Sequence, residues 1–143
     1  MVDIREQSPL SFAYVGDAVY SLLVREYLVK EKRYNINKLN KLTVQYVSAH
    51  GQYLALQLLE EILTEEEQTM VKRGKNTSKA TVAKHASVEE YRASTGFECM
   101  LGWLRLKGEY DRINYLVEYI SEILNLIKHN KRNPPALRWI FQV

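Results

Sequence analysis

Apolar residues along this chain recur at the spacing of helices rather than of strands. The clearest case is the stretch from about Glu109 to Lys128, where they recur every three or four positions: Ile113, Leu116, Val117, Ile120, Leu124 and Ile127. A first helix is predicted from Pro9 to about Lys32, because Ser8 suits the N-cap and Pro9 the first helical position. No stretch alternates between apolar and polar residues as a half-buried strand does. The pattern therefore predicts an all-α fold.

Capping residues predict where three further helices begin. Asn35 is expected to cap a second helix, which breaks near Gly51, ahead of the apolar segment YLALQLLEEIL. Residues 64–67 and 87–90 have the pattern of a capping box, in which a Ser or Thr and a Glu three positions later satisfy the first backbone N–H groups. Gly74 is expected to close the first of these two helices. The segment GKNTSKATVAKHA that begins there is interpreted as a loop.

Composition agrees with a helical, single-domain protein. Six glycines and three prolines are about half the usual share, which argues against many short strands and turns. A length of 143 residues suits one domain, expected to span residues 1–143, with a core at about 8–128 and a C-terminal tail at 129–143. The tail is expected to pack against the domain or a partner because of its apolar residues, Leu137, Trp139, Ile140 and Phe141.

Several classes of protein are excluded by composition. The single cysteine, Cys99, rules out an internal disulfide and a metal site built from several cysteines. No apolar stretch approaches the roughly 18 residues that a membrane span needs. The N-terminus also lacks the apolar core of a signal peptide. We therefore expect a cytoplasmic protein that has no membrane partner.

The net charge of +3 hides an uneven distribution. Residues 68–88 contain no acidic residue and five basic ones, which are Lys72, Arg73, Lys75, Lys79 and Lys84. The rest of the chain is slightly acidic, so the whole positive excess lies in this one segment. Such a segment suits a polyanionic partner, or it is simply a solvated loop.

Two carboxylates occupy unusual helical positions. Asp17 follows Gly16, and its neighbours on the helix are mainly apolar, so its charge needs a partner or a metal ion. Glu98 lies beside small residues, between Gly96 and Gly102. Two helices that contain glycines can cross closely, which would bring both carboxylates to one place. Oxygen ligands without histidine or cysteine suit a hard cation such as Mg²⁺ or Mn²⁺.

Helix geometry alone leaves simpler alternatives open for both acids. Asp17 could be an N-cap or a partly exposed side chain, and Glu98 could form a salt bridge with Arg92 or Arg105.

Two motifs resemble one known family. The segment SFAYVGDAVYSLLVRE, at residues 11–26, is similar to the GD-containing signature helix of the ribonuclease III catalytic domain. The segment YRASTGFECMLGWLRLKG, at residues 91–108, is similar to that family's second metal-binding helix. The sequences of both motifs are most similar to those of the Mini-ribonuclease III subfamily, which has the catalytic domain without a double-stranded-RNA-binding domain. KLTVQYVSAHGQYLAL and VKRGKN also fit that subfamily, so the resemblance covers about residues 8–128.

The resemblance implies the catalytic residues and the cofactor. Asp17 and Glu98 match the two metal-binding catalytic acids, and the implied cofactor is Mg²⁺, with Mn²⁺ as a possible substitute. Full-length ribonuclease III has two further acids, and here Ala13 and Thr95 stand at those positions. This reduced pattern fits the subfamily. Cys99 stands where the family has a small alanine, so we interpret it as a packing residue rather than a nucleophile.

The resemblance also implies a fold and an activity. It predicts a helical bundle like the ribonuclease III catalytic domain, which forms a homodimer through its signature helix and cleaves double-stranded RNA. Metal-activated water would leave 5′-phosphate and 3′-hydroxyl ends. The implied substrate is precursor 23S (large-subunit) ribosomal RNA in the bacterial cytoplasm, with ribosomal proteins as further candidate partners. The alternatives are a catalytically inactive RNA-binding module or a helical protein-interaction domain; retention of both acids favours the enzyme.

The basic segment is the predicted RNA contact. A-form RNA presents phosphates and 2′-hydroxyls rather than readable base edges, and lysine, arginine and small polar side chains suit those groups. The predicted RNA-binding residues are Lys72, Arg73, Gly74, Lys75, Asn76, Lys79, Lys84 and His85.

Overall fold

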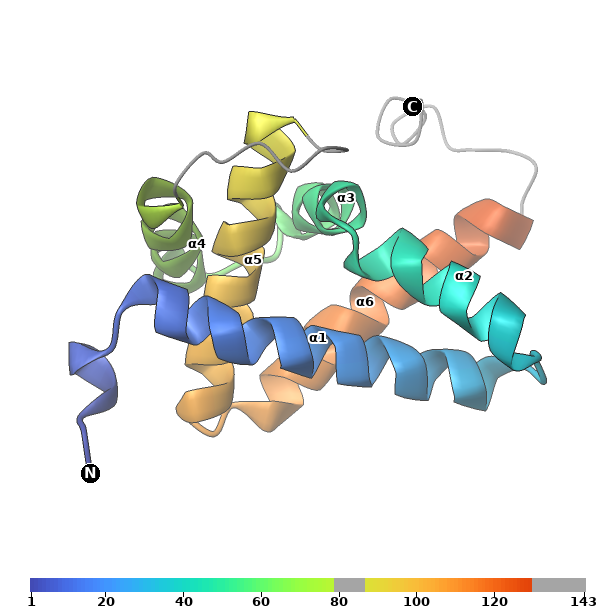
Figure 1. Cartoon of the computed structure of the whole chain (residues 1–143), viewed down its shortest axis with the longest axis horizontal. Helices are drawn as coiled ribbons and strands as arrows, with labels where there is room; N and C mark the ends of the chain where they lie inside the picture. Colours follow the sequence, from blue (N-terminus) through green and yellow to red (C-terminus); the bar gives the residue numbers. More distant parts are fainter. Residues whose placement is uncertain (79–86, 130–143) are drawn as a thin grey trace.

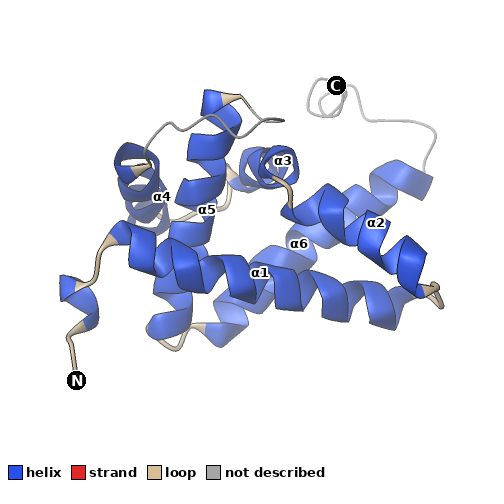
Figure 2. Ribbon diagram, viewed as in Figure 1, coloured by secondary structure: helices blue, strands red, loops and turns tan. Residues whose placement is uncertain are grey.

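The structure, a computed structural model, describes residues 1–78 and 87–129, and within them helices are joined by short loops and turns (Figures 1 and 2). These ranges contain no strand, as the periodicity predicts. A short 3₁₀ helix, η1 (Ile4–Glu6), precedes six α-helices: α1 (Pro9–Glu31), α2 (Ile36–Val47), α3 (Ala49–Leu59), α4 (Glu65–Thr77), α5 (Val88–Leu106) and α6 (Tyr110–His129). None of the described helices is both long enough and apolar enough to cross a membrane. The expectation for the apolar tail lies outside the described residues.

The predicted capping residues begin the helices as expected. The Ser8 hydroxyl accepts a hydrogen bond from the Ser11 N–H, and the Asn35 side chain accepts one from the Lys38 N–H. Both predicted capping boxes are formed, at residues 64–67 and 87–90. These interactions satisfy N–H groups that a helix cannot satisfy internally, so each helix start is defined locally.

Two of the helix ends predicted from the sequence are wrong. The second helix ends at Val47 rather than near Gly51, because Ser48 caps α3 and accepts a hydrogen bond from the Gly51 N–H at 3.1 Å. The helix at residues 65–77 continues through Gly74, which is buried inside it. A Cβ on Gly74 would lie 2.7 Å from the Cα of Gly96, so this glycine lets α4 pack closely on α5.

Helix α5 lies at the centre of the bundle, with α4 on one side, α3 on the other and α1 crossing it (Figure 1). It is buried around most of its circumference, as expected for a helix with apolar or small residues on every side. Phe97 is fully buried and meets the edge of the Tyr20 ring from α1, with ring centroids 4.8 Å apart. The core therefore fixes α5 relative to α1.

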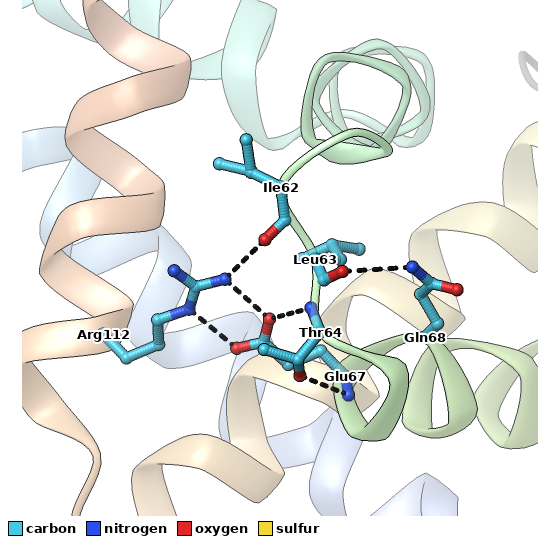
Figure 3. A network of polar contacts seen from close by, with 6 residues as sticks. All are labelled: Ile62, Leu63, Thr64, Glu67, Gln68 and Arg112. Carbon is cyan, nitrogen blue, oxygen red and sulfur yellow. Dashed lines mark hydrogen bonds and ion pairs between the residues drawn. The ribbon is translucent and has the colours of Figure 1, made fainter.

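An ion pair attaches α6 to the start of α4 (Figure 3). The Arg112 guanidinium donates to both carboxylate oxygens of Glu67, at 2.9 and 2.8 Å, and to the Ile62 carbonyl at 2.8 Å. Glu67 also accepts from the Thr64 N–H at 2.8 Å, which completes the capping box. Burial alone would raise the pKa of Glu67, but the hydrogen bonds from Arg112 and Thr64 hold it below its usual value.

Candidate active site

The backbones of α1 and α5 touch where they cross. A Cβ on Gly16 would lie 1.8 Å from the carbonyl oxygen of Glu98, and a Cβ on Gly102 would lie 1.7 Å from that of Phe12. Real Cβ atoms do not approach other atoms so closely, so any side chain at either position would push the helices apart. The close crossing predicted from the two glycines is confirmed.

This crossing brings Asp17 and Glu98 together. Asp17 follows Gly16 directly, while Glu98 lies one turn before Gly102, and the two carboxyl groups are close enough to share a hydrogen bond. Glu98 is half-buried, whereas Asp17 is exposed at the edge of the crossing. The apolar surroundings expected for Asp17 are therefore only partly present, because Tyr14, one turn earlier, is 84% exposed.

Neither candidate salt bridge to Glu98 is formed. The Arg92 Nε donates to the Lys75 carbonyl at 3.1 Å, and the Arg105 guanidinium lies over the Tyr110 ring, 4.4 Å from its centroid. Among the described residues, no ion pair neutralises the charge at Asp17 and Glu98.

The electrostatics of the pair suit a divalent cation. Burial, a hydrogen bond with Asp17 and the negative charge of Asp17 together raise the pKa of Glu98 to about 8, although a hydrogen bond with Gln52 acts in the opposite direction. A cation between the two carboxylates would replace the proton that they otherwise share. The described residues offer no group of three or more metal-ligating side chains, so water and a substrate phosphate would complete the coordination. Mg²⁺ accepts such a shell readily.

Sequence reasoning missed Gln52 of α3 as a member of this site. Its side chain is 3% exposed and lies close enough to Glu98 to lower the pKa of that carboxyl group. Gln52 lies four and seven positions before Leu56 and Leu59, which are both buried, so helical spacing places it on the core side of α3. A polar residue among the core-facing positions of this helix was the sequence signal that could have identified Gln52 as a site residue.

Cys99 is a packing residue, as interpreted from the sequence. It is fully buried beside Gly74 of α4. Burial raises the pKa of its thiol to about 11, although the charge of Arg73 and a backbone hydrogen bond from Gly74 act in the opposite direction. The thiol therefore stays protonated at neutral pH and is a poor nucleophile.

The basic segment divides into a helical part and a part outside the described residues. Lys72, Arg73 and Asn76 are exposed on the last turns of α4, and Lys75 is partly exposed. Residues 74–77, which the sequence assigns to a loop, are thus helical, because α4 ends at Thr77. Gly74 is corrected from an RNA contact to a packing residue because it is buried against α5. The remaining predicted contacts lie outside the described residues: Lys79, Lys84 and His85.

Comparisons with known proteins agree with this architecture. The Ribonuclease III domain matches residues 10–109, which include α5 and all but the first residue of α1. A Mini-ribonuclease 3 of Clostridium tetani is 39% identical over 132 residues, which cover 92% of this chain and 85% of the relative. The Mini-ribonuclease 3 of Enterococcus faecalis is 41% identical over 121 residues, which cover 83% and 92% of the two chains.

A solved structure shares the fold as well. The crystal structure of a protein from Fusobacterium nucleatum matches with a TM-score of 0.76 and 31% sequence identity, covering 85% of this chain and 98% of that one. The predicted ribonuclease III-like helical bundle is confirmed. Sequence and fold together show that the chain belongs to the ribonuclease III family, within the Mini-ribonuclease 3 group.

Proposed function

We propose that this endoribonuclease cleaves double-stranded RNA in a metal-dependent reaction at the crossing of α1 and α5. The proposal rests on one observation, the pair of carboxyl groups of Asp17 and Glu98 that Gly16 and Gly102 bring together. Two acids this close repel each other when ionised, which costs free energy in a protein that has no use for them. A cation-binding role accounts for their juxtaposition.

Each acid has a distinct place in the proposed site. Exposed Asp17 and half-buried Glu98 would hold Mg²⁺, or Mn²⁺ as a substitute, through carboxylate oxygens. When bound there, the cation supplies Lewis acidity, which activates water and stabilises charge on the phosphodiester. In the hydrolysis we propose, the water oxygen bonds to phosphorus and the bond from phosphorus to the 3′ oxygen breaks. The leaving oxygen takes a proton, so the products carry 5′-phosphate and 3′-hydroxyl ends.

The surroundings of the site support RNA as the substrate. Exposed Lys72 and Arg73 lie on α4, which packs on the same helix that contributes Glu98. We propose that these cations contact phosphates of a duplex, together with Lys75 and Asn76. The sequence adds Lys79, Lys84 and His85, which lie outside the described residues.

The first helix has an exposed apolar strip that supports a homodimer. Leu10, Tyr14, Leu22 and Val29 are all exposed, and their spacing places them within about a third of the circumference of α1. Asp17 lies at the margin of this strip. Burying the strip against a second copy would remove apolar area from water and place two sites in one particle, one for each strand of a duplex.

The biological substrate that we propose is precursor 23S (large-subunit) ribosomal RNA in the cytoplasm of a bacterium, with ribosomal proteins on that RNA as further partners. It can be tested by mapping the ends that the purified chain produces from a precursor 23S transcript, with and without bound ribosomal proteins.

Activity is tested with a duplex RNA and a single-stranded RNA of the same sequence. We expect the purified chain to cut only the duplex, only when Mg²⁺ or Mn²⁺ is present, and to stop when EDTA is added. The alternative is a catalytically inactive module of the same fold. It predicts that the duplex shifts on a native gel but stays intact at every metal concentration, and that result would contradict the proposal.

A further inference from the structure

Gln52 is a buried polar residue on the core side of α3. The other buried residues from Ala55 to Leu59 on the same helix are apolar, whereas the Gln52 side chain is 3% exposed. Burial of an amide is costly unless its donors and acceptor are paired. The partners of this side chain therefore indicate what it does.

The orientation of the amide is fixed by the backbone. The Gln52 Nε2 donates to the Val47 carbonyl at 3.1 Å. A flipped amide would place its own oxygen against that carbonyl, and two acceptors cannot pair. The second N–H of the same nitrogen is then available to the carboxylate of Glu98, whose pKa Gln52 lowers as a nearby hydrogen-bond donor does.

The amide oxygen has no donor. The Gln52 Oε1 is buried and accepts no hydrogen bond from any residue in the described part of the chain. An acceptor that is buried and unpaired destabilises the fold. A donor is therefore missing next to Glu98, and a water molecule in the shell of a bound cation has hydrogens to donate.

A second glutamine shows what a purely structural role looks like. Gln68 occupies the same position in α4 as Gln52 does in α3, and its Nε2 donates to the Leu63 carbonyl, also at 3.1 Å (Figure 3). Both contacts join the fourth residue of a helix to the carbonyl just before its N-cap. Gln68 is exposed, however, and Glu98 is paired with Gln52 instead. The contact at the helix start is thus shared, while the buried oxygen and the bond to Glu98 are particular to Gln52.

The start of α3 is held in place around Gln52. Gly51 lies so close to α2 that a Cβ there would be 2.1 Å from the Gln45 carbonyl oxygen. The His50 Nδ1 pairs with Glu90 in the first turn of α5, which ties α3 to the helix that contributes Glu98. These contacts on the two preceding residues limit how far Gln52 can move.

We propose that Gln52 is a positioning residue of the site: its N–H holds the Glu98 carboxylate toward Asp17, and its Oε1 accepts a hydrogen bond from water around the bound cation. This inference rests on the proposed function, since it requires a cation at the pair. Partners of this kind, which orient a metal ligand, are worth about 10- to 100-fold in metal affinity or activity.

The test compares Gln52→Met with Gln68→Met. Methionine preserves the length of the side chain and removes its hydrogen bonds, so both variants lose the same helix-start contact. Binding of Mn²⁺ to the RNA-free protein is measured by electron paramagnetic resonance, and duplex cleavage gives kcat and KM. We expect Gln52→Met to weaken Mn²⁺ binding and lower kcat by about 10- to 100-fold with KM unchanged, and Gln68→Met to match the wild type.

Gln52→Glu is the second variant in case Gln52→Met does not fold. It keeps the shape of the side chain but replaces the N–H donors to Glu98 and to the Val47 carbonyl by a carboxylate oxygen, so we expect kcat to fall by at least about 10-fold. Wild-type Mn²⁺ affinity and kcat in every folded Gln52 variant would overturn this inference and leave the proposed function intact. A wild-type protein that neither binds Mn²⁺ nor cleaves duplex RNA would overturn the proposed function first, and this inference with it.

Discussion

Substituting Gly16 by alanine tests whether the helix crossing builds the site. The new Cβ would lie 1.8 Å from the Glu98 carbonyl oxygen, which belongs to the backbone and cannot rotate away. Ordinary contact requires about 1.5 Å more, so α1 and α5 must move apart by about that distance. Because Asp17 is the next residue, its carboxyl group moves away from Glu98 as well.

Two opposing effects determine how much Gly16→Ala changes the stability of the fold. Alanine is favoured over glycine inside a helix by about 1 kcal/mol. Overpacking typically costs about 1–3 kcal/mol, and overlap with a backbone atom belongs at or above the upper end. We therefore expect Gly16→Ala to lower the free energy of unfolding by about 2 kcal/mol. A misplacement of about 1 Å at reacting groups costs on the order of 100-fold in rate, so kcat should fall by at least that factor.

The assay combines thermal unfolding with single-turnover cleavage of duplex RNA under conditions where the protein is folded. Leu116→Ala is the matched control, because Leu116 is fully buried in α6, which contributes neither acid nor either crossing glycine, and its truncation costs about 2–5 kcal/mol. The control should lose as much stability yet keep a cleavage rate near that of the wild type. If Gly16→Ala cleaves at the wild-type rate, or if both variants lose rate in proportion to their stability, the crossing does not position the acids.

Three further predictions concern other parts of the molecule. Because the pKa of Glu67 is lowered, its pairing with Arg112 stabilises the fold fully above the usual carboxyl pKa of 4.5, and this stabilisation is lost as the pH falls through the lowered pKa. Glu67→Gln should therefore lower the free energy of unfolding by about 3 kcal/mol at pH 7 and make Tm depend less on pH in acid. A dependence of Tm on pH equal to that of the wild type would refute this. Three cations of the basic segment are replaced together by alanine: Lys72, Arg73 and Lys75. Duplex binding should weaken and its slope against salt should fall by about 2 to 3 in log–log form, whereas an unchanged slope would exclude them as phosphate contacts. Because burial raises the pKa of Cys99 to about 11, iodoacetamide should label the native protein at pH 8 far more slowly than the unfolded protein, and equal rates would contradict the packing role.

The positions at which helices begin were predictable because the interactions that define them are local. Ser8 and Asn35 cap their helices through groups only three residues away. Helix ends were less predictable where a residue serves tertiary packing. Gly74 has the sequence character of a helix terminator, but α5 lies against it and the helix continues. Nothing in the local sequence distinguishes these two uses of a glycine.

Part of the site was predictable because it, too, depends on residues that are close in sequence. Gly16, Gly96 and Gly102, near the two acids in sequence, indicated a close crossing, and the motifs around them indicated the family. Gly96 instead packs against α4, where a Cβ on it would lie 2.5 Å from the Val71 carbonyl oxygen. Helical spacing shows which residues share a side of a helix but not whether another helix covers that side, so the exposure of Asp17 could be given only as an alternative. Gln52 was missed because its role depends on the packing of α3 against α5, which only the three-dimensional arrangement reveals.

The central claim is that Asp17 and Glu98 together form the catalytic metal site. It is tested most directly by single-turnover cleavage of duplex RNA in Mg²⁺ by Asp17→Asn and Glu98→Gln, with duplex binding measured in parallel. Each substitution keeps the size of the side chain and removes its negative charge, so we predict a loss of at least about 1,000-fold in rate with binding retained. A rate near that of the wild type in either variant would contradict the account.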